Sequence, residues 1–169
     1  MGGHVSGPNK YYINHLAKII NKPRFKNRVD LSLCIMAKTD INTRDDIFLL
    51  VSTFYGKVSK DATLGPIFSK AIVNWDEHLQ LLTTFWESSL FMTRKLDNKY
   101  RGNPLEAHIK VDAANNHSIT EMHFGIWLNL WLQTIDELFK GEVAENAKRR
   151  ARKMATFLYM SMFQARSVQ

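Results

Sequence analysis

Helical periodicity is the feature that most restricts what this chain can fold into. Apolar side chains recur at the three- and four-residue spacing that lines one face of an α-helix, in the segments 43–58, 74–90, 118–140 and 142–166. Residues that cap helix N-termini open the first three, at Thr43, at Asn74 and in Ser118-Ile119-Thr120-Glu121, which has the pattern of a capping box. Leu64-Gly65-Pro66-Ile67-Phe68 is expected to break the helical run. No stretch alternates as a β-strand would, so we predict an all-α fold.

The composition is that of one folded domain. The chain has 169 residues, of which 45% are hydrophobic, and this is enough to form a buried core. No apolar run approaches the ~20 residues that a membrane span needs, and the first residues lack the pattern of a signal peptide. The one cysteine, Cys34, cannot form an intramolecular disulfide. We therefore expect a cytoplasmic protein without a membrane partner.

The positive charge is unevenly distributed along the chain. Of the net charge of +7, residues 1–40 contribute +5, from seven lysines and arginines against two aspartates. The remaining residues are close to neutral, which argues against a nucleic-acid partner. We predict a basic N-terminal extension over 1–40, mobile or loosely docked, and a separate domain over 41–169. A tail that binds something acidic is the alternative for the extension.

The histidine at position 108 has the surroundings of a metal-ligating side chain. Gly102 and Pro104 precede His108, and such residues predict a turn followed by a short helix. The apolar residues Ala107 and Ile109 flank the histidine. An imidazole held in apolar surroundings after such a turn can serve as the fifth ligand of haem iron. A core histidine that pairs with a polar group remains the alternative.

A second histidine, His78, lies within an arc of large apolar side chains on the helix predicted over 74–90. Burial of an imidazole there costs free energy unless it finds a partner, and a backbone carbonyl could be that partner. The chain has no Cys-x-x-Cys, His-Glu-x-x-His or Glu-x-x-His motif and no glycine-rich phosphate loop, so zinc, di-iron and nucleotide sites lack their ligands. A helical pocket rich in aromatics suits a flat apolar cofactor such as haem.

The order and spacing of several motifs closely resemble those of the group III truncated haemoglobins. The resemblance covers about residues 41–166 and rests on Phe54-Tyr55, Leu64-Gly65-Pro66-Ile67-Phe68, Trp75-Asp76-Glu77-His78, Phe85-Trp86, Tyr100-Arg101-Gly102-Asn103-Pro104 with His108, and Ile126-Trp127-Leu128. Residues 1–40 have no counterpart in the family, and the loop 112–117 is longer than the linker expected there. The resemblance therefore does not predict the path from the His108 turn into the next helix.

The resemblance implies a two-over-two helical sandwich that encloses haem b. By position, His108 is similar to the proximal iron ligand of the family, and Tyr55, His78 and Trp127 resemble its three polar residues on the distal side. The pocket walls would be formed by Phe54, Phe68, Leu82, Phe85 and Trp86. Arg101 and Lys110 are candidates to pair with the haem propionates, with plain surface charges as the alternative.

The function implied is the binding of O2, NO and CO at a histidine-ligated iron. Hydrogen bonds from Tyr55 and Trp127 to a ligand with partial negative charge would contribute about 1.5–3 kcal/mol each. Together they would slow ligand release by roughly 10² to 10⁴, which favours ligand chemistry or sensing over transport. His78 could gate the pocket, donate to the ligand or ligate the iron. An NO dioxygenase or peroxidase with a separate reductase, and a haemless helical interaction or sensor domain, are the alternatives.

Overall fold

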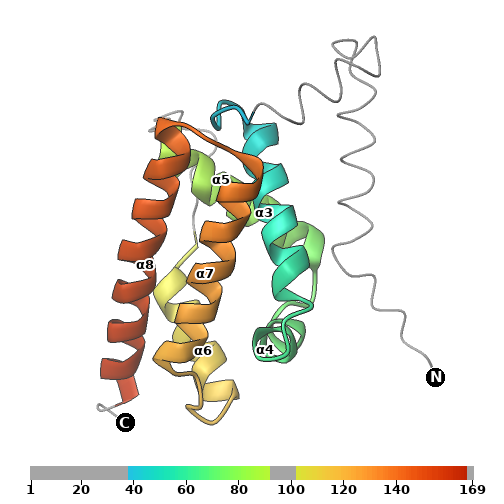
Figure 1. Cartoon of the computed structure of the whole chain (residues 1–169). Coiled ribbons are helices and arrows are strands. Elements are labelled where there is room, and N and C mark those ends of the chain that lie inside the picture. Colours follow the sequence, from blue (N-terminus) through green and yellow to red (C-terminus); the bar gives the residue numbers. More distant parts are fainter. Residues whose placement is uncertain (1–37, 92–101, 167–169) are drawn as a thin grey trace, which may run out of the picture.

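The computed structural model describes residues 38–91 and 102–166. The expectations for residues 1–37, including Cys34, and for Arg101 lie outside these residues. The described part of the chain contains six α-helices and no strand, as the periodicity predicts: α3 (Arg44–Val58), α4 (Leu64–Ala71), α5 (Trp75–Phe91), α6 (Pro104–Ala114), α7 (Glu121–Leu138) and α8 (Glu142–Arg166) (Figure 1). Within this part, no helix combines the length and the apolar character needed to cross a membrane.

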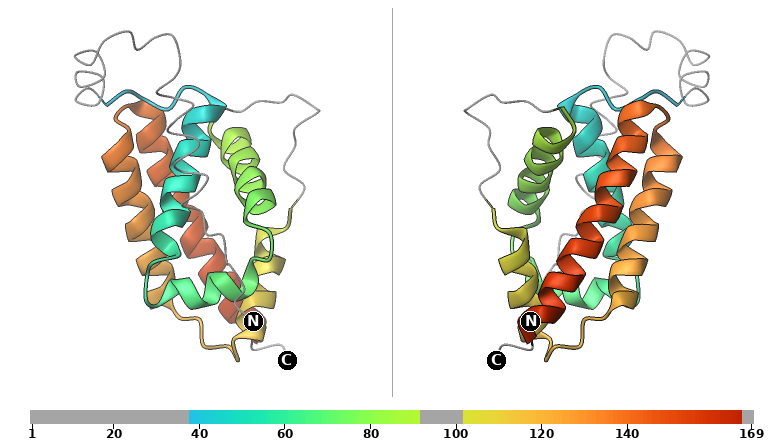
Figure 2. Two further views of the ribbon diagram at one scale, coloured as in Figure 1. Left: turned by 90° about the vertical axis from the view of Figure 1, so that its right-hand side faces the viewer. Right: turned by 90° about the vertical axis from the view of Figure 1, so that its left-hand side faces the viewer.

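The helices form two layers, as expected for a two-over-two sandwich. In one layer α3 packs against α5, in the other α7 packs against α8, and α3 contacts α7 between them. The short helix α6 lies against the C-terminal part of α8, and α4 joins the first layer below α3 (Figure 2). The buried core between the layers includes Ile47, Leu50, Phe54, Trp86, Trp131, Ile135, Ala147 and Ala151.

The ends of the helices agree with the capping signals at two positions and differ at a third. Thr43 caps α3 in a capping box with Asp46, and the Asn74 side chain accepts hydrogen bonds from the first turn of α5. The capping box predicted at Ser118–Glu121 is wrong, because the N-cap of α7 is Thr120 and its partner is His123. Asn116 at φ 54° and His117 at φ 55° are two consecutive left-handed residues in the connection between α6 and α7. The N-cap of α7 therefore lies two residues later than predicted.

The segment expected to break the first helix is itself helical. Residues Leu64–Ala71 form α4, with Pro66 in its first turn, where the missing N–H of a proline is not needed. Asp61 prepares this start, since its side chain accepts hydrogen bonds from the backbone N–H groups of Thr63 and Leu64. The chain is therefore non-helical only between Val58 and Leu64, and Phe68 on α4 packs against the edge of the core.

The end of the predicted extension contacts the domain. The Asp40 carboxylate accepts hydrogen bonds from the N–H groups of Val143 at 2.9 Å and Ala144 at 2.8 Å, in the first turn of α8. Burial opposes the charge of this carboxyl group, but the backbone donors outweigh it and lower its pKa. Gly141 leaves room for this contact, because a Cβ there would lie 2.3 Å from the Asp40 side chain. The boundary after residue 40 stays a prediction.

Candidate functional site

His108 is fixed in one orientation and one tautomer by its own helix. Asn103 caps α6 and Pro104 occupies its first turn, so the Pro104 carbonyl lies one turn before the imidazole. The His108 Nδ1 atom is 2.6 Å from that carbonyl oxygen and must therefore carry the proton. Burial lowers the pKa of His108, although the carbonyl partner opposes this, and the ring is neutral at pH 7. Its Nε2 atom is thus the one with a free lone pair.

Aromatic side chains from two other helices support the imidazole. The ring of Phe124 on α7 lies 5.9 Å from the His108 ring at an interplanar angle of 30°. Phe124 in turn makes an edge contact with Tyr159 on α8, at 5.8 Å. The His108 side chain is therefore fixed by one hydrogen bond and by packing against the second layer of the sandwich.

A buried ion-pair cluster anchors the helix that carries His108. Asp112, 1% exposed, accepts hydrogen bonds from Arg166 Nε at 2.8 Å and Arg166 Nη2 at 2.7 Å, at the end of α8. The same carboxylate pairs with His117 Nδ1 at 2.9 Å and accepts from the N–H of Ile119 at 3.3 Å. Burial raises the pKa of Asp112, but these donors outweigh it, and the net result is a lowered pKa. Sequence reasoning missed this cluster.

The residues predicted for the distal side are brought together around Tyr55. The Tyr55 ring lies edge-on to His78 at 5.3 Å, to Trp75 at 5.9 Å and tilted to Phe68 at 5.7 Å. Burial lowers the pKa of His78 to about 4, so its imidazole is neutral at pH 7. Its Nε2 atom is buried and has no hydrogen-bond partner among the described residues. A buried polar atom without a partner costs free energy unless a ligand supplies one.

Trp127 belongs to the same aromatic group. Phe54 contacts Tyr55 at 4.8 Å and Trp127 at 5.2 Å, so it lies between the two predicted donors. Trp131 stacks on Trp127 at 5.8 Å and on Trp86 at 4.5 Å, which continues the aromatic packing into the core. Of the other predicted wall residues, Leu82 and Phe85 are half-buried at the border of this core.

The predicted propionate partner Lys110 already has a carboxylate partner. Its ammonium group lies 2.6 Å from Glu106 on the same helix, and its side chain is 72% exposed. An exposed pair of this kind contributes little to stability, so Lys110 stays free to exchange partners. In the described part of the chain, no three His, Cys, Asp or Glu side chains gather to hold a bare metal ion. A single neutral histidine is instead one of the donors that can hold haem iron.

The fold and the surroundings of His108 are similar to those of the truncated haemoglobins. A search against protein-family models gives no match. The chain is 29% identical over 123 residues to the "Group 3 truncated hemoglobin ctb" of Campylobacter jejuni, a stretch that covers 70% of this chain and 90% of that protein. It superposes on the crystal structure of the group III truncated hemoglobin from Campylobacter jejuni with a TM-score of 0.64 and 28% identity, over 75% of this chain and 95% of the other.

The resemblance to the group III truncated haemoglobins is thus confirmed by sequence and by fold. The chain is a homologue of these proteins, and its all-helical architecture is theirs. The homology supports haem binding of the globin type. The roles of individual side chains are not tested by these comparisons and belong to the proposal below.

Proposed function

We propose that the chain binds haem b through His108 and binds O2, NO or CO on the face lined by Tyr55, His78 and Trp127. The observation that carries the proposal is the 2.6 Å contact of His108 Nδ1 with the Pro104 carbonyl, in a homologue of the truncated haemoglobins. This contact leaves a neutral imidazole with its Nε2 lone pair free. The buried and unpartnered Nε2 atom of His78 supports a ligand on the distal side.

The haem group, when bound, supplies an iron with an open coordination position for a diatomic ligand. The Tyr55 hydroxyl and the Trp127 indole N–H would donate hydrogen bonds to that ligand, and Phe54, which contacts both rings, holds them in position. Phe68, Leu82, Phe85 and Trp86 would exclude water from the pocket, which strengthens these hydrogen bonds. Lys110 is a weaker candidate for a propionate, and Arg101 lies outside the described residues.

His78 would act as a neutral group, because its pKa of about 4 leaves it uncharged at pH 7. A neutral imidazole carries one proton, so it can donate to a ligand from Nε2 only in one tautomer. The contact of its ring with Tyr55 couples the two side chains, and a change in the His78 rotamer would alter the Tyr55 environment. Gating, donation and iron ligation therefore remain the three candidate roles of His78.

Strong hydrogen bonding on the distal side favours ligand chemistry or sensing over transport. Two donors to a partly charged ligand contribute about 3–6 kcal/mol together, which corresponds to a release slower by roughly 10² to 10⁴. Turnover as an NO dioxygenase or a peroxidase would need electrons from a separate reductase. Steady-state assays with NO or peroxide distinguish these enzymes from a protein that only binds its ligand.

Absorption spectra of the purified protein test the haem proposal. We expect a Soret band that shifts on reduction and again with CO, and we expect His108→Gly to lose the pigment until imidazole is added. His123→Gln is the matched control, since this histidine serves as a helix-cap partner and its loss should cost only about 1 kcal/mol of stability. A colourless wild-type protein, or a His108→Gly variant with an unchanged spectrum, would refute the proposal.

The distal arrangement has its own test. Tyr55→Phe removes the hydroxyl and keeps the ring packing, so we expect O2 dissociation to become roughly 10- to 100-fold faster. Stopped-flow measurement of the off-rate gives the answer, with Phe68→Leu as a control that changes the pocket wall but no donor. An unchanged off-rate in Tyr55→Phe would contradict the distal assignment.

A further inference from the structure

One side of α8 is exposed to solvent along most of its length. The opposite side is buried against the core and includes Ala147, Ala151, Ala155, Leu158 and Met162. In the right view of Figure 2, α8 lies in front of the other helices and turns its exposed side to the viewer. We call this side the outer face of α8, and its residues are Arg149, Arg152, Lys153, Thr156, Met160 and Phe163, all exposed.

The positive charge of the domain is concentrated on this helix. Helix α8 contains six basic and two acidic residues, a net charge of +4, and no acidic residue follows Glu145. Residues 41–141 contain ten basic and twelve acidic residues, a net charge of −2. A concentrated charge of this kind attracts and orients an oppositely charged partner more strongly than the same charge spread over the whole surface.

The cations of the outer face lack acidic partners. Lys148, which is largely buried beside them, pairs with two carboxylates. Arg149 has only the side-chain oxygen of Asn146, at 3.4 Å from its Nη2 atom. Within the part of the chain that the structure describes, Arg152 and Lys153 pair with no carboxylate. Exposed cations without partners can bind an acidic surface without first breaking an internal ion pair.

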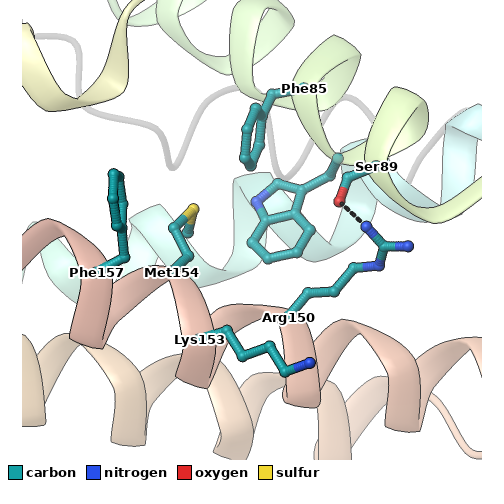
Figure 3. A pocket seen from close by; sticks show the side chains of 7 residues that line it. Phe85, Ser89, Arg150, Lys153, Met154 and Phe157 are labelled. Atoms are coloured by element: carbon teal, nitrogen blue, oxygen red, sulfur yellow. Dashed lines mark hydrogen bonds between the residues drawn. The ribbon is translucent and has the colours of Figure 1, made fainter.

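The cationic part of the outer face lies beside an opening of the proposed haem pocket. Phe85 and Trp86, two of the proposed pocket walls, line an open groove of about 360 Å³ between α5 and α8. Arg150 and Lys153 line the same groove, and Figure 3 shows them on α8 with Phe85 across from them on α5. The groove is part of the cofactor site. A protein bound to the outer face would therefore lie next to the edge of the haem.

We propose that the outer face of α8 binds an acidic protein that donates single electrons, such as a small flavoprotein. This inference rests on the proposed haem function, in which turnover needs electrons from a separate protein. The reduced flavin of the partner is oxidised by one electron and the haem iron is reduced from ferric to ferrous, so no covalent bond forms or breaks. The residues of α8 hold the partner and do not themselves react.

Two features favour a protein over a nucleic acid or a membrane. The cations of the outer face occupy only residues 149–153, and the apolar Met160 and Phe163, 51% and 50% exposed, follow them. Protein interfaces combine apolar and charged surface in this way, whereas a nucleic acid needs a longer track of cations. The inner side of α8 is buried in the core, so the helix cannot lie flat in a membrane.

Calorimetric titration of the full-length protein with a flavodoxin, an acidic flavoprotein, measures the binding. We expect one site whose affinity falls roughly 10-fold between about 20 and 200 mM salt, because salt screens exposed charges. The double variant Arg149→Glu with Arg152→Glu should bind at least ~10-fold more weakly at low salt, because it reverses two charges of the outer face. Haem-free protein should show the same binding, since the outer face belongs to the chain itself.

Stopped-flow reduction of the ferric protein by reduced flavodoxin, followed at the Soret band, measures the electron transfer. We expect the second-order rate constant of the double variant to fall roughly 10- to 100-fold at low salt. Its spectrum with CO and its O2 dissociation rate should equal those of the wild type, because neither Arg149 nor Arg152 lines the groove.

A matched control separates the outer face from net charge. Arg152→Glu alone should lower the rate constant about fivefold. Lys60→Glu makes the same change of charge at an exposed residue before α4, which packs against α3 and α7, and it should change the rate constant by less than about twofold. Circular dichroism spectra of all variants should equal that of the wild type.

Four results would overturn the proposal. They are the absence of flavodoxin binding, a rate constant that does not depend on salt, an equal loss in Lys60→Glu and Arg152→Glu, and tighter binding to a DNA duplex or to anionic phospholipid vesicles than to flavodoxin. Unchanged binding in the double variant would also contradict it, because another part of the chain would then hold the partner. A colourless protein that still binds flavodoxin with this salt dependence would refute only the haem proposal.

Discussion

The Asp112–Arg166 ion pair gives the sharpest test of how the His108 helix is held. Asp112 is 1% exposed and receives two hydrogen bonds from one guanidinium, which is the strongest form of such a pair. Removal of one partner from a buried pair costs about 3–5 kcal/mol, because the other charge is left without compensation. The Arg166 side chain is 21% exposed and regains some hydration, so we expect the lower part of that range.

Urea unfolding of Asp112→Ala is the measurement. We expect a loss of about 3 kcal/mol with an unchanged m-value. Asp112→Asn keeps the shape and one acceptor oxygen, and its loss should be smaller, about 2 kcal/mol. In a double-mutant cycle with Arg166→Met, the two single losses should not add, with a coupling of about 1–3 kcal/mol. A loss below about 1 kcal/mol in Asp112→Ala, or additive losses in the cycle, would refute the reasoning.

The contribution of this pair also depends on pH. The pKa of Asp112 is lowered in the folded protein, so the unfolded chain takes up a proton there first as the pH falls. Its stabilising contribution is complete above the unfolded-state pKa of about 3.9 and is lost as the pH falls through the lower folded-state value. The stability difference between wild type and Asp112→Asn should therefore be constant near neutral pH and shrink below about pH 4.

Three further predictions concern other groups. Burial lowers the pKa of His78 to about 4, so this histidine is neutral in the folded protein and stability should fall as the pH drops from about 6.5 to 4. His78→Phe should weaken that pH dependence in urea titrations of the haem-free protein. An unchanged slope of stability against pH would count against this prediction. Asp40→Ala should cost about 0.5–2 kcal/mol by loss of the α8 cap, measured as a lower urea midpoint, and a neutral result would show that water replaces it. Gly141→Ala should lower the melting temperature, because the φ angle of Gly141 is 156° and the new methyl group would clash with Asp40. An unchanged melting temperature would mean that the loop that carries Asp40 moves freely.

Most of the secondary structure was predictable from local sequence. The apolar spacing predicted the four long helices, and the end of the last one at Arg166 agrees with the structure. The motifs around Tyr55, His78, His108 and Trp127 predicted the relationship to the truncated haemoglobins, which the comparisons confirm. These signals are readable because helix periodicity and capping depend on residues three or four positions apart.

The connections between helices were less predictable. The segment 64–68 was expected to be a break and forms the start of α4, since a proline in a first turn permits a helix as readily as it ends one. The N-cap of α7 was predicted at Ser118, but it lies at Thr120. Asn116 and His117 adopt left-handed conformations, and the capping pattern of the sequence did not predict them. Turn geometry decides both cases.

The sequence by itself determined that this chain is helical, which faces of its helices are apolar, and which histidines lie among them. Only the tertiary structure decided that Asp112 meets Arg166, 54 positions away, and that His78 lies edge-on to Tyr55. The physical reason is distance along the chain. A helix forms through neighbours in sequence, whereas an ion pair, a ring contact or a groove depends on how whole helices pack.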